Sequence, residues 1–214
     1  MDKAFKDLDD WVTGSDMPNG KKRVLKAAVK LFSKQGYDGT STAQIAEESQ
    51  MSQATIFKYF KSKNDLLMFI IQPIIEHILP IYVEDFVKEV NVNKSSLEQM
   101  VHFIVHNRYQ FLLQNKDAFI ILISQVLIND KIKDMLLEKL NVMKNVFIDN
   151  VWAALKETNE LRDDIEVIQF IRVMAGQIAF YFLQTQRVLT PRDADETEHD
   201  LQEIERSIIL TIKK

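Results

Sequence analysis

Residues 21–63 read KKRVLKAAVKLFSKQGYDGTSTAQIAEESQMSQATIFKYFKSK, and the interpretation of the whole chain starts from this stretch. After a basic start, apolar residues between Val24 and Phe32 recur at the spacing of one helix face. The pattern stops at Gly36, and glycine commonly follows the last turn of a helix. The sequence therefore predicts a first helix that ends at Gly36.

Two short helices are expected after Gly36. The first runs from about residue 41 to 49, and Ser41 and Gln44 have the spacing of a capping box at its start. The second begins at Ser52, a favourable N-cap residue, and carries the apolar residues Ile56 and Phe60. Because only two residues separate these helices, they must cross sharply, as in a helix-turn-helix unit. In such a unit the second helix enters the DNA major groove.

The order of residues in this region resembles the DNA-binding domain of TetR-type transcription regulators. The residues that carry the resemblance are Ala27-Ala28, Leu31-Phe32, Gly36-Tyr37, Ser41-Thr42, Ile45-Ala46, Met51-Ser52, Ile56-Phe57, Tyr59-Phe60, Lys63 and Leu66. The resemblance covers roughly residues 20–70, and beyond that point it is one of architecture only.

The resemblance implies an all-α fold of the TetR type. Residues 1–19 would form an N-terminal extension, residues 20–66 a three-helix helix-turn-helix DNA-binding domain, and residues 67–214 a helical effector-binding and dimerisation domain. It also implies three partners: double-stranded operator DNA, a second copy of the chain, and a small-molecule effector. No cofactor is expected.

Roles in DNA binding can be assigned by residue type and position. Thr42 offers a hydroxyl and a helix N-terminus to phosphate, whereas the first turn of the second short helix faces base edges or a thymine methyl group. Basic and tyrosine side chains farther along would contact phosphates, although Tyr59 could instead pack on the domain core. The predicted DNA-binding residues are Thr42, Ser52, Gln53, Ala54, Thr55, Phe57, Lys58, Tyr59 and Lys63.

Two residues depart from the family pattern. Phe57 stands where Tyr is usual, so a phenolic hydrogen bond to phosphate is lost and Phe57 is expected to pack or to contact sugar. Gln50 stands where Gly is common, so a residue with a Cβ must occupy a turn position that often needs a positive φ. We expect a small cost in stability there.

Charge is distributed unevenly along the chain. The net charge is −4, but residues 21–63 contain nine Lys or Arg and three Asp or Glu, a net +6, which leaves −10 for the remainder. A basic module on an acidic body suits phosphate binding at one end. The alternative is that Lys21, Lys22, Lys26 and Lys30 simply form the solvated face of a helix; the order of the motif favours DNA.

Composition narrows the class of protein. The 214 residues suffice for one or two domains, and the hydrophobic share of 46% and charged share of 27% are typical of soluble globular proteins. With no cysteine and no recognisable secretory signal, we expect a cytoplasmic protein without disulfides. Charges interrupt the apolar runs well short of a membrane span, so no membrane partner is expected.

The remainder of the chain is expected to be helical. A marginal helix is predicted over residues 3–12, where Trp11 either docks on the body or belongs to an unstructured tail. Ser62 and Asp65 cap a connecting helix that Pro73 should kink and Pro80 should end. Further helices are predicted at about residues 96–114, with a cap at Ser95, and then at 117–128, 131–157, 164–188 and 192–212, the last opened by Pro191.

The resemblance places a dimer interface on the final two helices and an effector pocket in the body. A small-residue strip and an apolar stripe supply the predicted dimerisation residues Ala175, Gly176, Ala179, Leu201, Ile204 and Ile208. The predicted effector-binding residues are Phe103, His106, Tyr109, Phe119, Leu122, Gln125, Phe147, Gln177 and Tyr181, with Phe111 and Trp152 as further apolar candidates. Side chains of these types are more often ordinary core or surface than ligand contacts.

Enzymatic and metal-binding functions find little support. His102 and His106 lie one helical turn apart and could share a metal, but no Glu lies between them and no carboxylate neighbour is evident, so no metal is predicted. A phosphate-binding glycine loop and a nucleophile elbow are both missing, so no catalysis is expected. We expect a transcriptional repressor that a small, hydrophobic effector releases from its operator; the alternative is an activator or helical interaction protein of the same fold without ligand control.

Overall fold

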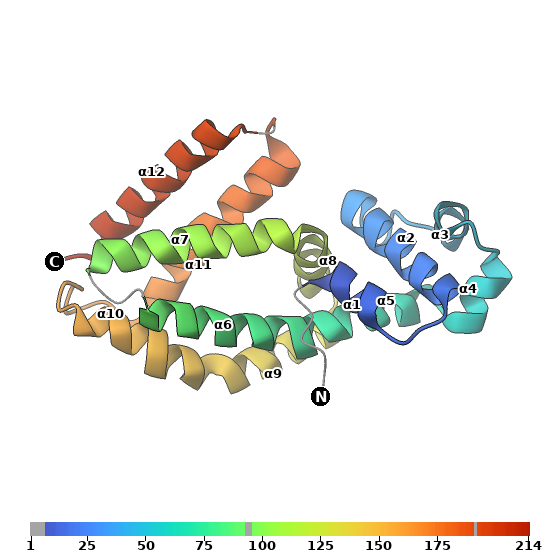
Figure 1. Cartoon of the computed structure of the whole chain (residues 1–214), viewed down its shortest axis with the longest axis horizontal. Helices are drawn as coiled ribbons and strands as arrows, with labels where there is room; N and C mark the ends of the chain where they lie inside the picture. Colours follow the sequence, from blue (N-terminus) through green and yellow to red (C-terminus); the bar gives the residue numbers. More distant parts are fainter. Residues whose placement is uncertain (1–6, 93–95, 191) are drawn as a thin grey trace. The chain divides into compact units, whose positions relative to one another are not determined.

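The structure, a computed structural model, describes residues 7–92, 96–190 and 192–214 (Figure 1). Within these ranges every regular element is helical, and a single bridge joins Leu161 to Lys213. The prediction of an all-α fold is therefore confirmed. In chain order the α-helices are α1 (Leu8–Gly14), α2 (Asn19–Gln35), α3 (Thr42–Ser49), α4 (Gln53–Tyr59), α5 (Lys63–Pro73), α6 (Leu79–Val92), α7 (Leu97–Gln114), α8 (Lys116–Val126), α9 (Asp130–Val146), α10 (Ala153–Glu157), α11 (Val167–Leu183) and α12 (Ala194–Ile212). Three π-helical turns, η1 (Ile74–Ile78), η2 (Phe147–Trp152) and η3 (Gln184–Val188), continue α5, α9 and α11.

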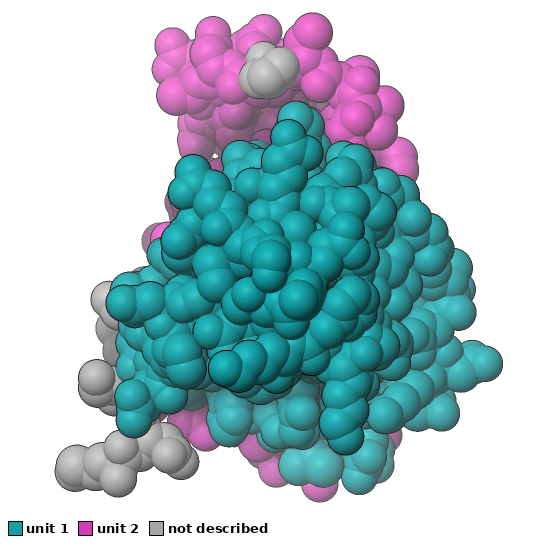
Figure 2. All heavy atoms as spheres, turned by 90° about the vertical axis from the view of Figure 1, so that its right-hand side faces the viewer, with its two compact units in different colours: residues 1–82, 115–142 teal, residues 83–114, 143–214 magenta. Residues whose placement is uncertain are grey.

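The chain forms two compact units that do not follow its linear order (Figure 2). The first unit comprises Met1–Tyr82 and Asn115–Val142, and the second comprises Val83–Gln114 and Met143–Lys214. Helix α8 thus belongs with the helix-turn-helix stretch, where it packs against α2 and α5. The functional boundary expected near residue 66 stays a prediction.

The first unit is built around the apolar faces of α2, α3, α4 and α5. Each of these helices contributes to one core through a buried residue: Leu25, Ile45, Ile56 and Leu66. Helix α1 adds Leu8 and Val12 to this core, and the Trp11 ring lies 5.6 Å from that of Phe69. Of the two alternatives for Trp11, docking is the one observed; residues 3–6 of the predicted N-terminal helix lie outside the described residues.

Pro80 does not end the connecting helix, and that prediction is wrong. The helix leaves α geometry directly after Pro73, and in η1 the backbone N–H of Leu79 donates to the carbonyl of Ile74, five residues earlier. Helix α6 then starts at Leu79, so Pro80 falls in its first turn, where proline is tolerated. The chain accommodates both prolines by a π turn between two α-helices.

The second unit contains α7, α11 and α12. Helix α12 packs mainly on α7, and α11 contacts both of them. The residue that follows α12 is tied to the start of α7, because the Lys213 ammonium contacts the Glu98 carboxylate; it also lies 3.0 Å from the Glu160 carboxylate. These contacts hold the pKa of Lys213 above its usual value and that of Glu98 below it.

The long helical segments predicted from periodicity are confirmed, with shifts at their ends. The segment 131–157 is a continuous run of α9, η2 and α10, and the segment 164–188 starts later, at Val167. The final helix starts at Ala194, and Asp193 and Glu196 form its capping box. The expected cap Ser95 and the expected opening residue Pro191 lie outside the described residues. At α7 the hydroxyl of Ser96 accepts from the Gln99 N–H.

Among the described residues, two helical stretches are long and apolar enough to cross a membrane by length and composition, Lys63–Val90 and Val167–Val188. Charged residues interrupt both stretches, as expected from the sequence, for example Glu76 in the first and Arg172 in the second, and π turns join shorter helices into these longer ones. Length and composition are weak evidence that a helix spans a membrane, because the buried core helices of soluble proteins can be equally long and apolar. In the first stretch, Leu66, Leu67 and Ile71 are fully buried.

Candidate functional site

Helices α3 and α4 form the predicted helix-turn-helix. The Ser41 hydroxyl accepts from the Gln44 N–H at 3.2 Å, and the Gln44 side chain accepts from the Ser41 N–H at 2.8 Å, so the predicted capping box is present. Thr42 is the first residue of α3 and is half-buried. The capped N-terminus orients backbone N–H groups outward, the geometry that phosphate requires.

The turn between the helices places Gln50 in the left-handed region. Its φ is 54°, the positive value expected at a turn position where glycine is common. Its N–H donates to carbonyls at the end of α3. The Arg23 guanidinium on α2 donates to the Gln50 side-chain oxygen at 2.9 Å. This bond holds the turn against α2 and offsets part of the backbone strain.

Gln50→Gly should raise the free energy of unfolding by up to about 1 kcal/mol, because glycine adopts a positive φ without a Cβ clash. Gln50→Ala is the matched control, since it also loses the Arg23 hydrogen bond but keeps the Cβ. Urea unfolding followed by circular dichroism measures both. Equal stability of the two variants would contradict the assignment of strain to this turn.

The first turn of α4 presents a small exposed surface. The Ser52 hydroxyl caps the helix by accepting from the Thr55 N–H at 3.1 Å. Gln53 and Ala54 are exposed at this end, whereas the half-buried Thr55 hydroxyl lies 2.8 Å from that of Ser52. Gln53 is therefore better placed than Thr55 to hydrogen-bond a base edge. Phe57 is 47% exposed.

Tyr59 has features of both roles considered for it, packing on the domain core and contacting phosphate. It is half-buried and packs against the core of the first unit. A Cβ added at Gly20 would lie 2.8 Å from the Tyr59 hydroxyl oxygen and 2.9 Å from the terminal methyl group of Met51. Gly20 thus permits the start of α2 to approach the Tyr59 ring closely. A phosphate contact by the Tyr59 hydroxyl stays a prediction.

Lys63 points into the first unit. Its ammonium donates to the carbonyls of Tyr37 at 2.9 Å and Thr40 at 3.0 Å, and lies 4.0 Å from the centre of the Tyr37 ring. It therefore fixes the loop that leads into α3. The predicted phosphate contact of Lys63 is not tested, but reaching DNA would require it to leave these carbonyls.

Most basic residues of α2 have partners within the chain. Lys26 pairs with Asp9 at 2.7 Å and Lys30 with Glu48 at 2.6 Å, while Lys22 donates to the Thr13 carbonyl at 2.7 Å. The Lys21 ammonium lies 3.8 Å from the centre of the Phe69 ring, and burial lowers its pKa. Lys58 and Lys61 are exposed near the end of α4.

Comparison with known proteins agrees with this geometry. Residues 24–68 match the family model described as bacterial regulatory proteins, tetR family. Residues 24–68 thus form a helix-turn-helix domain of the TetR family. The chain is 30% identical over 82 residues to the HTH-type transcriptional regulator HbdR of Aromatoleum sp., which covers 38% of this chain and 34% of that protein. It is 50% identical over 46 residues to the HTH-type regulator YvkB of Bacillus subtilis, which covers 22% of this chain and 24% of that protein. These matches thus span at most about a third of either relative.

Solved structures share the fold over nearly the whole chain. A transcriptional regulator from Saccharomonospora viridis in complex with choline aligns with a TM-score of 0.63 at 18% identity, over 91% of this chain and 97% of that one. FadR of Bacillus subtilis in complex with stearoyl-CoA aligns with a TM-score of 0.56 at 16% identity, over 88% and 95%. The superantigen PfiT also aligns, with a TM-score of 0.59 at 18% identity, over 94% and 99%. The TetR fold therefore extends beyond the helix-turn-helix, and the fold alone does not fix a function.

The predicted effector-binding residues fall in both units. Phe119, Leu122 and Gln125 lie on α8 in the first unit, where Leu122 packs against the helix-turn-helix core. The other six lie in the second unit: Phe103, His106, Tyr109, Phe147, Gln177 and Tyr181. There the Phe103 ring stacks on that of Phe86, with centroids 6.0 Å apart.

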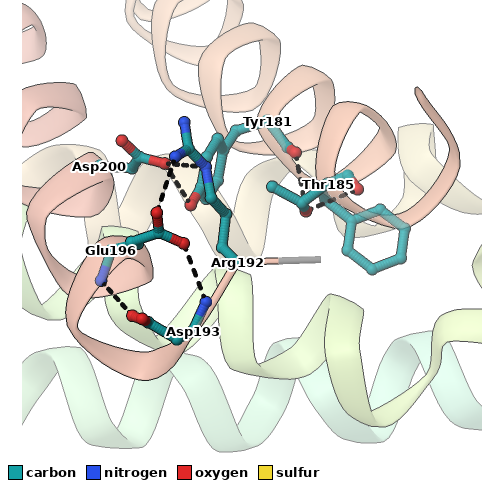
Figure 3. Close-up of polar contacts among 7 residues, drawn as sticks. Tyr181, Thr185, Arg192, Asp193, Glu196 and Asp200 are labelled. Atoms are coloured by element: carbon teal, nitrogen blue, oxygen red, sulfur yellow. Dashed lines mark hydrogen bonds and ion pairs between the residues drawn. The ribbon is translucent and has the colours of Figure 1, made fainter. Parts of the chain in front are cut away.

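The Tyr181 side chain on α11 is hydrogen-bonded to α12 (Figure 3). Its hydroxyl donates to the Asp200 carboxylate at 3.0 Å, and its ring centre lies 5.3 Å from that of Tyr109. Burial, and then the Asp200 carboxylate, raise the pKa of Tyr181. Arg192 also pairs with Asp200, at 3.3 Å. A ligand that bound the Tyr181 hydroxyl would have to compete with Asp200.

Two hollows open on the surface of the units. One, of about 320 Å³, is lined by residues of α2 and the end of α3, including Arg23, Lys26 and Glu48. The other, of about 250 Å³, is lined by Trp152, Arg162 and their neighbours. None of the nine predicted effector residues lines either hollow, so the effector pocket stays a prediction.

The predicted dimerisation residues differ in exposure, and Ala179 on α11 is half-buried. Leu201 and Ile208 are 2% and 0% exposed, so they belong to the chain's own core and offer no surface to a partner; their assignment to the interface is corrected. Ile204 is half-buried. Ala175 and Gly176 are exposed on α11, and a Cβ added at Gly176 would meet nothing within 4 Å. The small-residue strip is therefore open to a partner.

Proposed function

We propose that the protein is a sequence-specific DNA-binding transcriptional regulator that reads the major groove with α4. The observation that carries this proposal is the exposed first turn of a capped α4, with Gln53 and Ala54 outward and Ile56 buried. The match of residues 24–68 to the TetR family model supports it. Selection of bound DNA from a random pool tests it, because an enriched pseudopalindrome is expected and an unenriched pool would contradict sequence-specific binding. Gln53→Ala should change the base preference within each half-site.

The DNA-bound form in this proposal is a homodimer. A two-fold symmetric pair places two α4 helices about one DNA turn apart, about 34–36 Å, which matches two half-sites. The exposed face of α11 supports this arrangement, since apolar or small residues recur on it at helical spacing. These residues are Ile168, Ile171, Ala175 and Ala179, with the exposed Phe180 beside them.

We further propose that a small, hydrophobic effector releases the protein from its operator. Aligned structures that hold choline and stearoyl-CoA support ligand control in this fold. Operator titrations with and without each of these two probes test it, because an effector should weaken operator binding about 5- to 150-fold, and operator should weaken effector binding by the same factor. A helical interaction protein or an activator without ligand control is the alternative, which unchanged operator affinity with a bound probe would favour.

Salt dependence should distinguish exposed from paired lysines. Lys58→Ala should weaken binding to operator and to random DNA alike and lower the salt slope by about 1 per subunit, since one phosphate contact is lost. Lys26→Ala is the matched control, because Lys26 pairs with Asp9. Fluorescence anisotropy over a series of salt concentrations measures both slopes. An equal change in the two variants would contradict the role given to Lys58.

A further inference from the structure

Helices α7 and α12 meet through two imidazoles and one carboxylate. His102 and His106 lie one turn apart on α7, and their ring centres are 4.3 Å apart. On α12, the Glu205 Oε1 atom lies 3.0 Å from His102 Nδ1 and 2.8 Å from His106 Nε2. The sequence shows the histidine pair but no carboxylate beside it, because Glu205 follows His106 by 99 residues.

We propose that His102, His106 and Glu205 form a binding site for a divalent transition-metal ion. One donor atom from each residue lies within 4.8 Å of the other two. Tetrahedral zinc with bonds of about 2.0–2.2 Å sets its ligand atoms about 3.3–3.6 Å apart, so small side-chain rotations suffice to bring the three donors onto one ion. Three protein ligands leave a fourth position for water.

The donor set determines which ions suit the site. Two imidazole nitrogens and one carboxylate oxygen suit zinc, nickel or copper, whereas magnesium and calcium prefer oxygen ligands. Entry from solvent is open, because the His102 side chain is 57% exposed, while the Glu205 side chain is only 13% exposed. The site is therefore accessible to solvent at His102, whereas the Glu205 carboxylate is largely enclosed.

A second carboxylate supports the orientation of His106. Glu198 lies two turns before Glu205 on α12, and its Oε2 atom is 3.8 Å from His106 Nδ1. With Nε2 directed at Glu205 and Nδ1 toward Glu198, the His106 ring has the carboxylate neighbour that commonly accompanies metal-ligating histidines. A bound ion would join α7 to α12 at this point.

Zinc titration of the untagged protein tests the proposal, with competition against a chromophoric chelator as the readout. We expect one zinc per chain, no binding of magnesium, and a loss of affinity of at least about tenfold in His106→Ala and in Glu205→Gln. Glu205→Gln can still hydrogen-bond both imidazoles, so it should fold, and circular dichroism checks this. His199→Ala is the matched control, because it removes an exposed histidine from the same helix.

Cobalt provides a second readout, because tetrahedral coordination gives intense visible absorption that should appear in the wild type and His199→Ala only. Zinc should also raise Tm in those two proteins, since an ion bound to the folded state stabilises it. Equal zinc affinity in wild type and Glu205→Gln, or loss of binding in His199→Ala, would overturn the site. Failure of the wild type to bind zinc would show that hydrogen bonds alone join these side chains.

Discussion

Phe180→Glu should convert the protein to a monomer and lower its affinity for operator by more than about 100-fold. Phe180 is 69% exposed on α11, next to the strip of Ala175, Gly176 and Ala179. A large aromatic side chain that contacts water costs hydration free energy unless a partner covers it. In a dimer that covers this position, the glutamate would be buried without a counter-charge, and the free energy needed to desolvate it would disrupt the interface. The monomer then reads one half-site and loses the contacts of the second.

Val142→Glu is the matched control for this substitution. Val142 is 70% exposed on α9, so it receives the same charge at the same exposure without touching the α11 strip. Size-exclusion chromatography with light scattering gives the mass of each variant, and anisotropy gives operator affinity. A dimeric Phe180→Glu variant, or a monomeric wild type at micromolar concentration, would contradict the assignment of the interface to α11.

Local features of the fold could be predicted because their causes lie within a few residues. The caps at Ser41, Ser52 and Ser62 depend on a hydroxyl and an N–H three residues later, and all three are present. The positive φ of Gln50 likewise follows from the turn that the motif requires. Pro80 was misjudged because a π turn changes the hydrogen-bond register before it, and residue spacing does not reveal π turns.

Contacts between distant segments could not be predicted. Lys63 looked available to phosphate, but its position depends on where the carbonyls of Tyr37 and Thr40 come to lie. Leu201 and Ile208 form an apolar stripe that suits a dimer as well as a core, and only the packing of α12 on α7 decides between them. Glu205 joins the two histidines by the same packing.

Ile56→Ala should lower operator affinity by up to about 1,000-fold while leaving the rest of the protein folded. Helix α4 has only seven residues, too few for a stable helix in isolation. Ile56, 2% exposed, is its one buried residue within the helix bounds, so this side chain anchors α4 to the core. Truncating a buried isoleucine to alanine costs about 2–4 kcal/mol, and that cost falls on the docking of α4.

The loss should appear as DNA affinity because docked α4 is the binding-competent state. If truncation lowers the docked fraction, the apparent dissociation constant rises by the same factor. Hydrogen exchange should show faster exchange in α4 than in α2, whose Leu25 and Phe32 remain buried. Leu137→Ala is the matched control, since Leu137 is 55% exposed on α9 and lies outside the helix-turn-helix. If Ile56→Ala binds operator as tightly as wild type, or if α2 and α4 lose protection together, α4 does not undock independently.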